Sequence, residues 1–264
     1  MGDLDKFKGK GGLPTAGQKP DWLKKPPKAV SSSADQIVRG ATARFAIALD
    51  ATGSMSGLID MAKKAITEIL KRVIAGAGRP VEIMLVAYRD YDVPQEVVEA
   101  SKLTGDANAL IAWLNRIDAH GGGANDGEAV ERALATIIDA ASFDAIVMAG
   151  DEPANSAAFL REKKGKGAAT AEDLARRLGQ AKTPVHTFVV GDDPRTVSSF
   201  ASIATLSGGK SGKLDGSNAM IDMAVMAMLA KLKGSEGVRT YMSHYHVTSH
   251  AADYGKLLLE GPRK

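Results

Sequence analysis

The sequence contains no cysteine, no long apolar run and little net charge. Without cysteine, neither a disulfide framework nor a thiolate metal site can form. The first residues, MGDLDKFKGKGG, lack the apolar segment that a secretory signal needs, and no later run approaches the roughly 18 apolar residues of a membrane span. These absences predict a soluble protein of the cytoplasm.

Much of the small excess of positive charge lies near one end of the chain. The formal net charge of +3 comes from 34 basic and 31 acidic residues, and residues 6–28 alone hold seven lysines against Asp21. Such a weak and local excess argues against a nucleic-acid-binding surface. The 264 residues, 44% of them hydrophobic, are enough for one globular domain with a sizeable core.

Composition divides the chain into three parts. Residues 1–41 are rich in Lys, Pro, Gly and Ser without a periodic apolar pattern, which predicts a flexible arm. Residues 42–233 alternate short apolar runs with amphipathic segments and are predicted to form the folded domain. Residues 234–264 are interpreted as a C-terminal extension that is solvated or forms a strand. Within it, His244, His246 and His250 are only a weak indication of a transition-metal site.

The apolar pattern of residues 42–233 is that of alternating strands and helices. Buried strands are predicted at residues 43–50, 81–90, 144–150 and 184–191. Shorter strands are expected at residues 96–104, paired beside the second strand, and at 210–215. Helices are predicted over residues 55–77, 106–117, 127–141, 171–182, 195–206 and 217–233. This succession predicts an α/β fold, a doubly wound and mostly parallel sheet with helices on both faces.

Polar side chains follow two of the predicted strands at the point where each strand ends. In a doubly wound sheet, ligands bind outside the carboxyl ends of the strands. The first strand ends in Asp50, with Thr52 and Ser54 behind it, and Asp151 follows the strand at 144–150. Carboxylates and hydroxyls without His or Cys suit Mg²⁺, Ca²⁺ or Mn²⁺. Taken alone, the first run also suits a helix N-cap, but together these residues favour a metal site.

This arrangement resembles the von Willebrand factor type A family. Its metal-ion-dependent adhesion site has an Asp-x-Ser-x-Ser run after the first strand, a Thr or Asp in a Gly-rich loop, and a later Asp after the fourth strand. The resemblance implies Asp50, Thr52, Ser54 and Asp151 as metal ligands. It also implies a six-stranded, Rossmann-like sheet in which residues 96–104 form the antiparallel edge.

The Gly-rich loop HGGGANDGEAV departs from the family pattern because it offers no obvious threonine. Counting back from GEAV, the loop ligand falls at Ala124, Asn125 or Asp126. Asp126 is the first choice because it carries a carboxylate, and Asn125 is the second. The resemblance covers roughly residues 42–233, and YRDYDV after the second strand resembles bacterial and protist members, including those found beside atypical kinases.

The resemblance implies a divalent-cation-dependent protein-binding module without enzymatic activity. In the family, the cation grips an Asp or Glu of a partner. Partners implied for intracellular members are an AAA+ ATPase or a component of a kinase or phosphatase system, in stress-resistance or phage-defence systems. The basic segment REKKGKG at residues 161–167 is expected in a surface loop, either steering an acidic partner or simply solvated.

Two other functions fit parts of the pattern. A magnesium-dependent phosphatase-like hydrolase would use Asp50 as nucleophile, but phosphatases of the haloacid dehalogenase type carry an acid/base Asp two residues later, where this chain has Thr52. A phosphate-binding site at Gly121–Gly123 before a helix is a third reading. The loop lacks both the lysine of a P-loop and the GxGxxG spacing, which argues against it.

Overall fold

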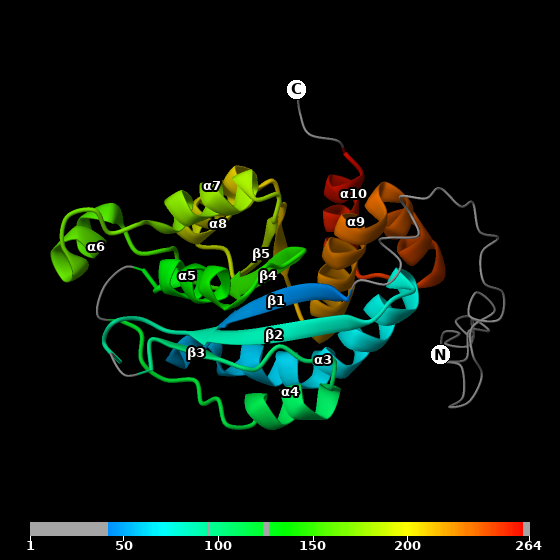
Figure 1. Ribbon diagram of the computed structural model, residues 1–264, viewed down its shortest axis with the longest axis horizontal. Helices are drawn as coiled ribbons and strands as arrows, with labels where there is room; N and C mark the ends of the chain where they lie inside the picture. Colours follow the sequence, from blue (N-terminus) through cyan, green and yellow to red (C-terminus); the bar gives the residue numbers. More distant parts are fainter. Residues whose placement is uncertain (1–41, 94–95, 124–126, 261–264) are drawn as a thin grey trace, which may run out of the picture. The chain divides into compact units, whose positions relative to one another are not determined.

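The computed structural model describes residues 42–93, 96–123 and 127–260 (Figure 1). The described residues belong to one unit, which spans Arg39–Lys264. The arm predicted at residues 1–41 lies outside the described residues. Of the helices in the described part, none is both long and apolar enough to cross a membrane.

A six-stranded sheet in the order β3-β2-β1-β4-β5-β6 forms the centre of this unit. Its strands are β1 (Ala43–Asp50), β2 (Val81–Tyr88), β3 (Val98–Ala100), β4 (Ala145–Gly150), β5 (Val185–Val190) and β6 (Ser211–Leu214). Only β3 is antiparallel to its neighbour. The predicted fold class and antiparallel edge are therefore confirmed, although β3 is shorter than the predicted 96–104.

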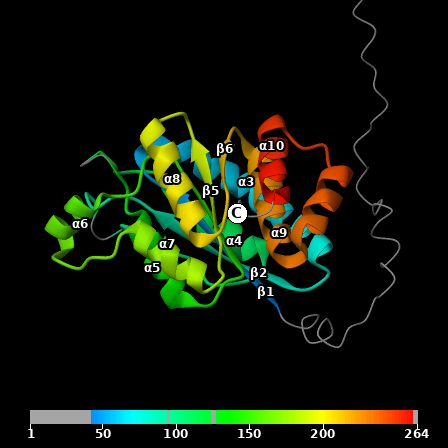
Figure 2. The same ribbon diagram turned by 90° about the horizontal axis from the view of Figure 1, so that it is seen from above.

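Helices cover both faces of the sheet. Side chains of β1 alternate between two cores, with Phe45 and Ile47 on one side and Ala46 and Ala48 on the other, as the two-residue period of a strand requires. The first face is covered by α3 (Ser56–Ala77), α4 (Ala107–Leu114), α9 (Ser217–His244) and α10 (Ser249–Leu259). The second is covered by α5 (Val130–Ala140), α7 (Ala171–Gln180) and α8 (Pro194–Ser207), which lie together in Figures 1 and 2.

The strand order reverses between β1 and β4, which makes their carboxyl ends the switch point of the sheet. Leu49 is paired with Ala149 in register, so the next residues, Asp50 and Gly150, end their strands side by side. On the other side of β1, Asp50 is in register with Tyr88, the last residue of β2. The fold thus brings the predicted site residues of β1 to the place where α/β sheets bind ligands.

The C-terminal extension is helical, so the expectation of a solvated or strand-forming segment is wrong. Helix α9 continues past Lys233 to His244, with a kink at Gly234, and α10 follows. Val238 and Tyr241 of α9 and Tyr254 of α10 are buried in the core that α3 also fills. Burial of these apolar side chains makes the extension part of the folded unit.

The basic segment 161–167 is also only partly a loop. Its first four residues form the last turn of α6 (Ala157–Lys164), which ends at Gly165. Leu160 is the one buried residue of this helix, and the rest of α6 is largely exposed. So little apolar periodicity explains why the sequence pattern did not indicate a helix here.

Candidate metal site

Asp50, Thr52 and Ser54 converge directly after β1. Asp50 is fully buried, and its Oδ1 accepts hydrogen bonds from the Thr52 backbone N–H at 2.9 Å and from Thr52 Oγ1 at 2.7 Å. Thr52 Oγ1 lies 3.3 Å from Ser54 Oγ, and since its only hydrogen points to Asp50, Ser54 is the donor in that pair. Asp50 Oδ2 is buried and has no hydrogen-bond partner among the described residues.

Asp151 stands beside this group, immediately after β4. Its Oδ1 is likewise buried without a hydrogen-bond partner in the described part of the chain. Burial, with a smaller effect of the Asp151 charge, raises the pKa of Asp50 to about 7, although hydrogen bonds from the Thr52 N–H and hydroxyl and from the Asp151 N–H oppose the shift. The two carboxylates are therefore close enough to repel each other, and each keeps one oxygen available.

Gly150 allows the ends of β2, β1 and β4 to approach closely. A Cβ atom at this position would lie 2.5 Å from Tyr88 Oη and 3.1 Å from Asp50 Oδ2. Tyr88 Oη donates to the Ala149 carbonyl at 3.2 Å, and burial keeps the pKa of this phenol well above its ordinary value. Tyr88 is therefore uncharged and lies close to the Asp50 carboxylate.

Glu128 adds a further carboxylate that the sequence pattern did not single out. A Cβ on Gly122 would lie 3.0 Å from Thr52 Cβ and 3.1 Å from Glu128 Oε1, so Glu128 faces Thr52 across this glycine. Burial, reinforced by the charges of Asp50, Asp90 and Asp151, raises the pKa of Glu128 to about 9. Its Oε2 is buried and has no hydrogen-bond partner within the described ranges. The sequence signal that could have indicated Glu128 is an acidic residue at the end of a Gly-rich loop, directly before a helix.

Backbone hydrogen bonds join the loops that carry these side chains. The Gly53 N–H donates to Gly121 O at 3.0 Å, which ties the loop after β1 to the Gly-rich loop. The Glu128 N–H donates to Pro153 O at 2.8 Å, and the Asn155 N–H donates to Glu128 O at 3.0 Å. The site is consequently held in place by main-chain contacts rather than by its own charged groups.

The loop after β2 is anchored by Arg89 and Asp90, both buried. The Arg89 guanidinium donates to Glu96 O at 2.9 Å, Asp118 O at 2.8 Å and Glu99 Oε1 at 2.9 Å. Asp90 Oδ1 accepts from Asn155 Nδ2 at 3.0 Å, which links this loop to the loop after β4. The YRDYDV segment therefore braces the site from the side.

The donor set suits a hard divalent cation. Asp50 and Asp151 each present a carboxylate oxygen that has no partner within the described ranges, and Thr52 and Ser54 add hydroxyls. The predicted loop ligands Asn125 and Asp126 lie outside the described residues. Among the described residues, no group of three or more His, Asp or Glu side chains is arranged so that it could hold a metal ion by itself. The assignment of these residues as ligands stays a prediction.

Comparison with known proteins identifies the fold. Residues 44–160 match the family model of the von Willebrand factor A domain. A search of curated proteins finds no match. Among solved structures, BatB from Bacteroides thetaiotaomicron is similar, with 15% identity and a TM-score of 0.53 over 72% of this chain and 99% of that chain.

Two further structures share the fold over part of their length. A von Willebrand factor type A protein from Catenulispora acidiphila has 17% identity and a TM-score of 0.51, over 73% of this chain and 43% of that chain. The pilus adhesin SpaC from Lactobacillus rhamnosus GG has 12% identity and a TM-score of 0.52, over 73% of this chain and 31% of that chain. At such identities the likeness concerns the fold alone.

Proposed function

Because residues 44–160 of this chain belong to a von Willebrand factor A domain, we propose that the protein binds a divalent cation at the switch point of its sheet and, through it, an acidic side chain of a partner protein. Domains of this family generally mediate protein–protein interactions. The cation, its ligands and the kind of partner are the parts of the function proposed here.

Two buried carboxylate oxygens that have no hydrogen-bond partner among the described residues, Asp50 Oδ2 and Asp151 Oδ1, carry the proposal. Burying two repelling carboxylates, each with one oxygen that receives no hydrogen bond from the described residues, costs free energy that a divalent cation would offset. Asp50, Thr52, Ser54 and Asp151 would hold Mg²⁺, Ca²⁺ or Mn²⁺, and Asp126, with Asn125 as the second choice, would complete the set. Bound there, the cation supplies positive charge and an open position for a partner's Asp or Glu oxygen.

Thr52 has a positioning role in this proposal. Its N–H and Oγ1 both donate to Asp50 Oδ1, which fixes the carboxylate and leaves Oδ2 without a partner among the described residues. The same arrangement leaves no carboxyl group two residues after Asp50, where a phosphatase of the haloacid dehalogenase type has its proton donor. We therefore propose binding rather than catalysis. A cytoplasmic role beside an AAA+ ATPase, or in stress resistance or phage defence, stays a prediction.

Isothermal titration calorimetry with MgCl₂ and MnCl₂ tests the proposal. Wild type is expected to bind, and Asp50→Asn is expected to bind at least about tenfold more weakly because it removes a charged ligand but keeps the shape. Asp60→Asn is the matched control, since Asp60 lies exposed on α3. Absence of binding to the wild type, or equal affinity in Asp50→Asn, would contradict the proposal. Magnesium-stimulated hydrolysis of p-nitrophenyl phosphate lost in Asp50→Asn would favour a hydrolase.

A further inference from the structure

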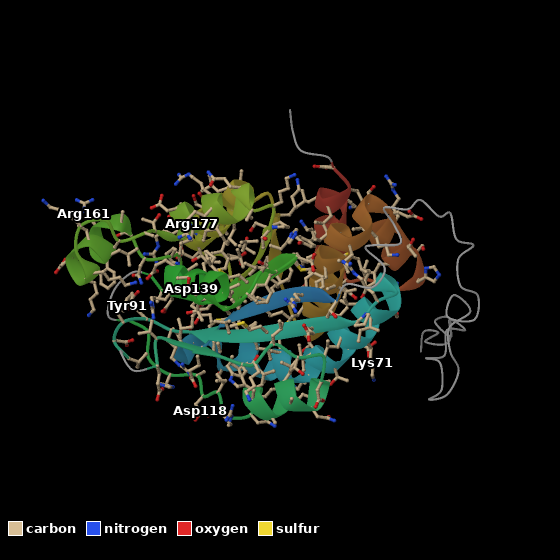
Figure 3. All side chains as sticks on the ribbon, viewed as in Figure 1. Lys71, Tyr91, Asp118, Asp139, Arg161 and Arg177 are labelled. Carbon is tan, nitrogen blue, oxygen red and sulfur yellow. The ribbon has the colours of Figure 1, made fainter. Side chains whose placement is uncertain are left out.

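A cavity of about 430 Å³ lies between α5, α7, the end of α6 and the segment that follows α6. Helix α5 lines it with residues spaced as one helical face, from Glu131 and Arg132 to Asp139. At a rise of 1.5 Å per residue, this face is roughly 12 Å long. Figure 3 shows Asp139 of α5 and Arg177 of α7 on these neighbouring helices.

Positive charge dominates the lining of this cavity. Glu131 is buried and bonds to Lys164 Nζ at 2.9 Å and to Tyr91 Oη, so the Glu131–Lys164 pair is neutral. The remaining charged lining consists of Arg132, Lys166 and Arg177 against Asp139. The three basic residues are exposed and form no ion pair with any residue that the structure describes. Their charge is therefore available to a ligand.

One end of the cavity is linked to the loops of the candidate site through Glu131. Its first lining residue, Glu131, comes within one helical turn of Glu128, which faces Thr52. Tyr91, from the loop after β2, bonds to Glu131, and Lys164 lies over its ring at 4.6 Å from the centroid. The loops of the metal site and the mouth of the cavity thus share side-chain contacts.

We propose that this basic cavity binds the acidic segment of the partner that flanks its metal-binding Asp or Glu, an inference that rests on the proposed function. An extended chain advances about 3.3 Å per residue, so about four partner residues span the cavity along α5. Arg132, Lys166 and Arg177 come from three different segments, which suits several carboxylates spread along a peptide. Lys166 of the REKKGKG segment thereby acquires a role in recognition, while Lys164 stays paired with Glu131.

Fluorescence anisotropy tests this with a labelled peptide in which one aspartate is followed by a run of glutamates. The full chain is titrated with excess MgCl₂ or with EDTA at low salt. Lys166→Ser/Arg177→Ser removes two cavity charges. Lys71→Ser/Arg116→Ser removes the same charge from exposed positions elsewhere, Lys71 being on α3 in Figure 3. The cavity variant is expected to bind about three- to tenfold more weakly, and the control within about twofold of wild type.

Four results decide the outcome. Magnesium-dependent binding unchanged by the cavity variant overturns the cavity's role and leaves the proposed function intact. Binding that needs the cavity but survives EDTA and Asp50→Asn overturns the proposed function and supports the acidic-peptide cavity. An equal loss of peptide affinity in the control variant overturns the inference, because binding then depends on the overall charge of the protein and not on the cavity. Tighter cavity-dependent binding of inorganic phosphate or of a single-stranded oligonucleotide than of the peptide overturns it too.

Discussion

Among single residues, Asp50 determines how the candidate site affects the stability of the metal-free protein. Its pKa is raised from 3.8 to about 7 in the folded state, chiefly by burial. A carboxyl group whose folded-state pKa is raised contributes full stability below its unfolded pKa and loses that contribution as the pH rises through the folded pKa. At pH 8 the metal-free protein therefore carries the whole cost of this buried charge, and Asp151 adds to it.

Asp50→Asn is consequently expected to stabilise the metal-free protein at pH 8, by about 1–3 kcal/mol, because the amide still accepts both bonds from Thr52 but carries no charge. The same variant is expected to lose the rise in urea midpoint that MgCl₂ produces in the wild type. Urea denaturation in EDTA and in MgCl₂ measures both effects. A metal-free Asp50→Asn less stable than wild type, with Asp60→Asn unchanged, would contradict this reasoning.

The residues of the candidate site differ in how far local sequence indicates them. Asp50, Thr52, Ser54 and Asp151 follow apolar strands directly, so strand pattern and residue chemistry were enough to select them. Glu128 was missed because its importance comes from burial against Thr52, a contact between distant loops. The role of Gly150 likewise depends on how closely three strands approach, which no local pattern expresses.

Among elements, the long apolar strands and amphipathic helices were predictable, and the peripheral helices were not. α3, α5 and α9 carry periodic apolar residues that the sheet buries. In the C-terminal segment, Val238 and Tyr241, and then Ala251 and Tyr254, are each three residues apart, which is a helical spacing. That signal was present but short, and the polar residues around it favoured a solvated interpretation.

His186 links β5 to α10 and makes this contact sensitive to pH. Its Nδ1 accepts the Lys210 N–H at 3.2 Å, so the ring is neutral there, and Tyr254 Oη donates to the same atom at 2.7 Å. Burial, with a smaller effect of the Lys210 charge, lowers the pKa of His186 from 6.5 to about 3. Below pH 6.5, His186 binds a proton in the unfolded chain but stays neutral in the folded protein. The free energy of unfolding therefore decreases as the pH falls toward 3.

Between pH 6.5 and 4.5, wild type is expected to lose about 2–3 kcal/mol more stability than His186→Gln, whose amide accepts a hydrogen bond but does not titrate. Urea denaturation across this range gives the difference in slope, in which contributions of the other acidic and basic groups cancel. His246→Gln, an exposed histidine, is the control and is expected to follow wild type. Parallel curves for wild type and His186→Gln would contradict the assignment.

At the scale of the whole molecule, the folded unit extends well beyond the region that the family model matches. That match ends at residue 160, within α6. The sheet continues with β5 and β6, and the core of the first face continues into α9 and α10. Arg72 of α3 donates to Asp222 at 3.1 Å and to Tyr241 Oη at 2.6 Å, which connects the matched region to both halves of α9.

Removing the residues after Lys233 is therefore expected to abolish cooperative unfolding, although the sequence pattern treats them as an appendage. The truncation exposes the surfaces that Val238, Tyr241 and Tyr254 cover. At about 1.5–3 kcal/mol for each buried side chain, with the bonds of Tyr241 lost in addition, the cost approaches the 5–15 kcal/mol that holds a typical domain folded. Thermal denaturation followed by circular dichroism measures this.

Lys256→Ser, on the exposed side of α10, is the control and is expected to unfold like wild type. A truncated chain that unfolds cooperatively at the wild-type temperature would show that α10 and the second half of α9 do not support the fold.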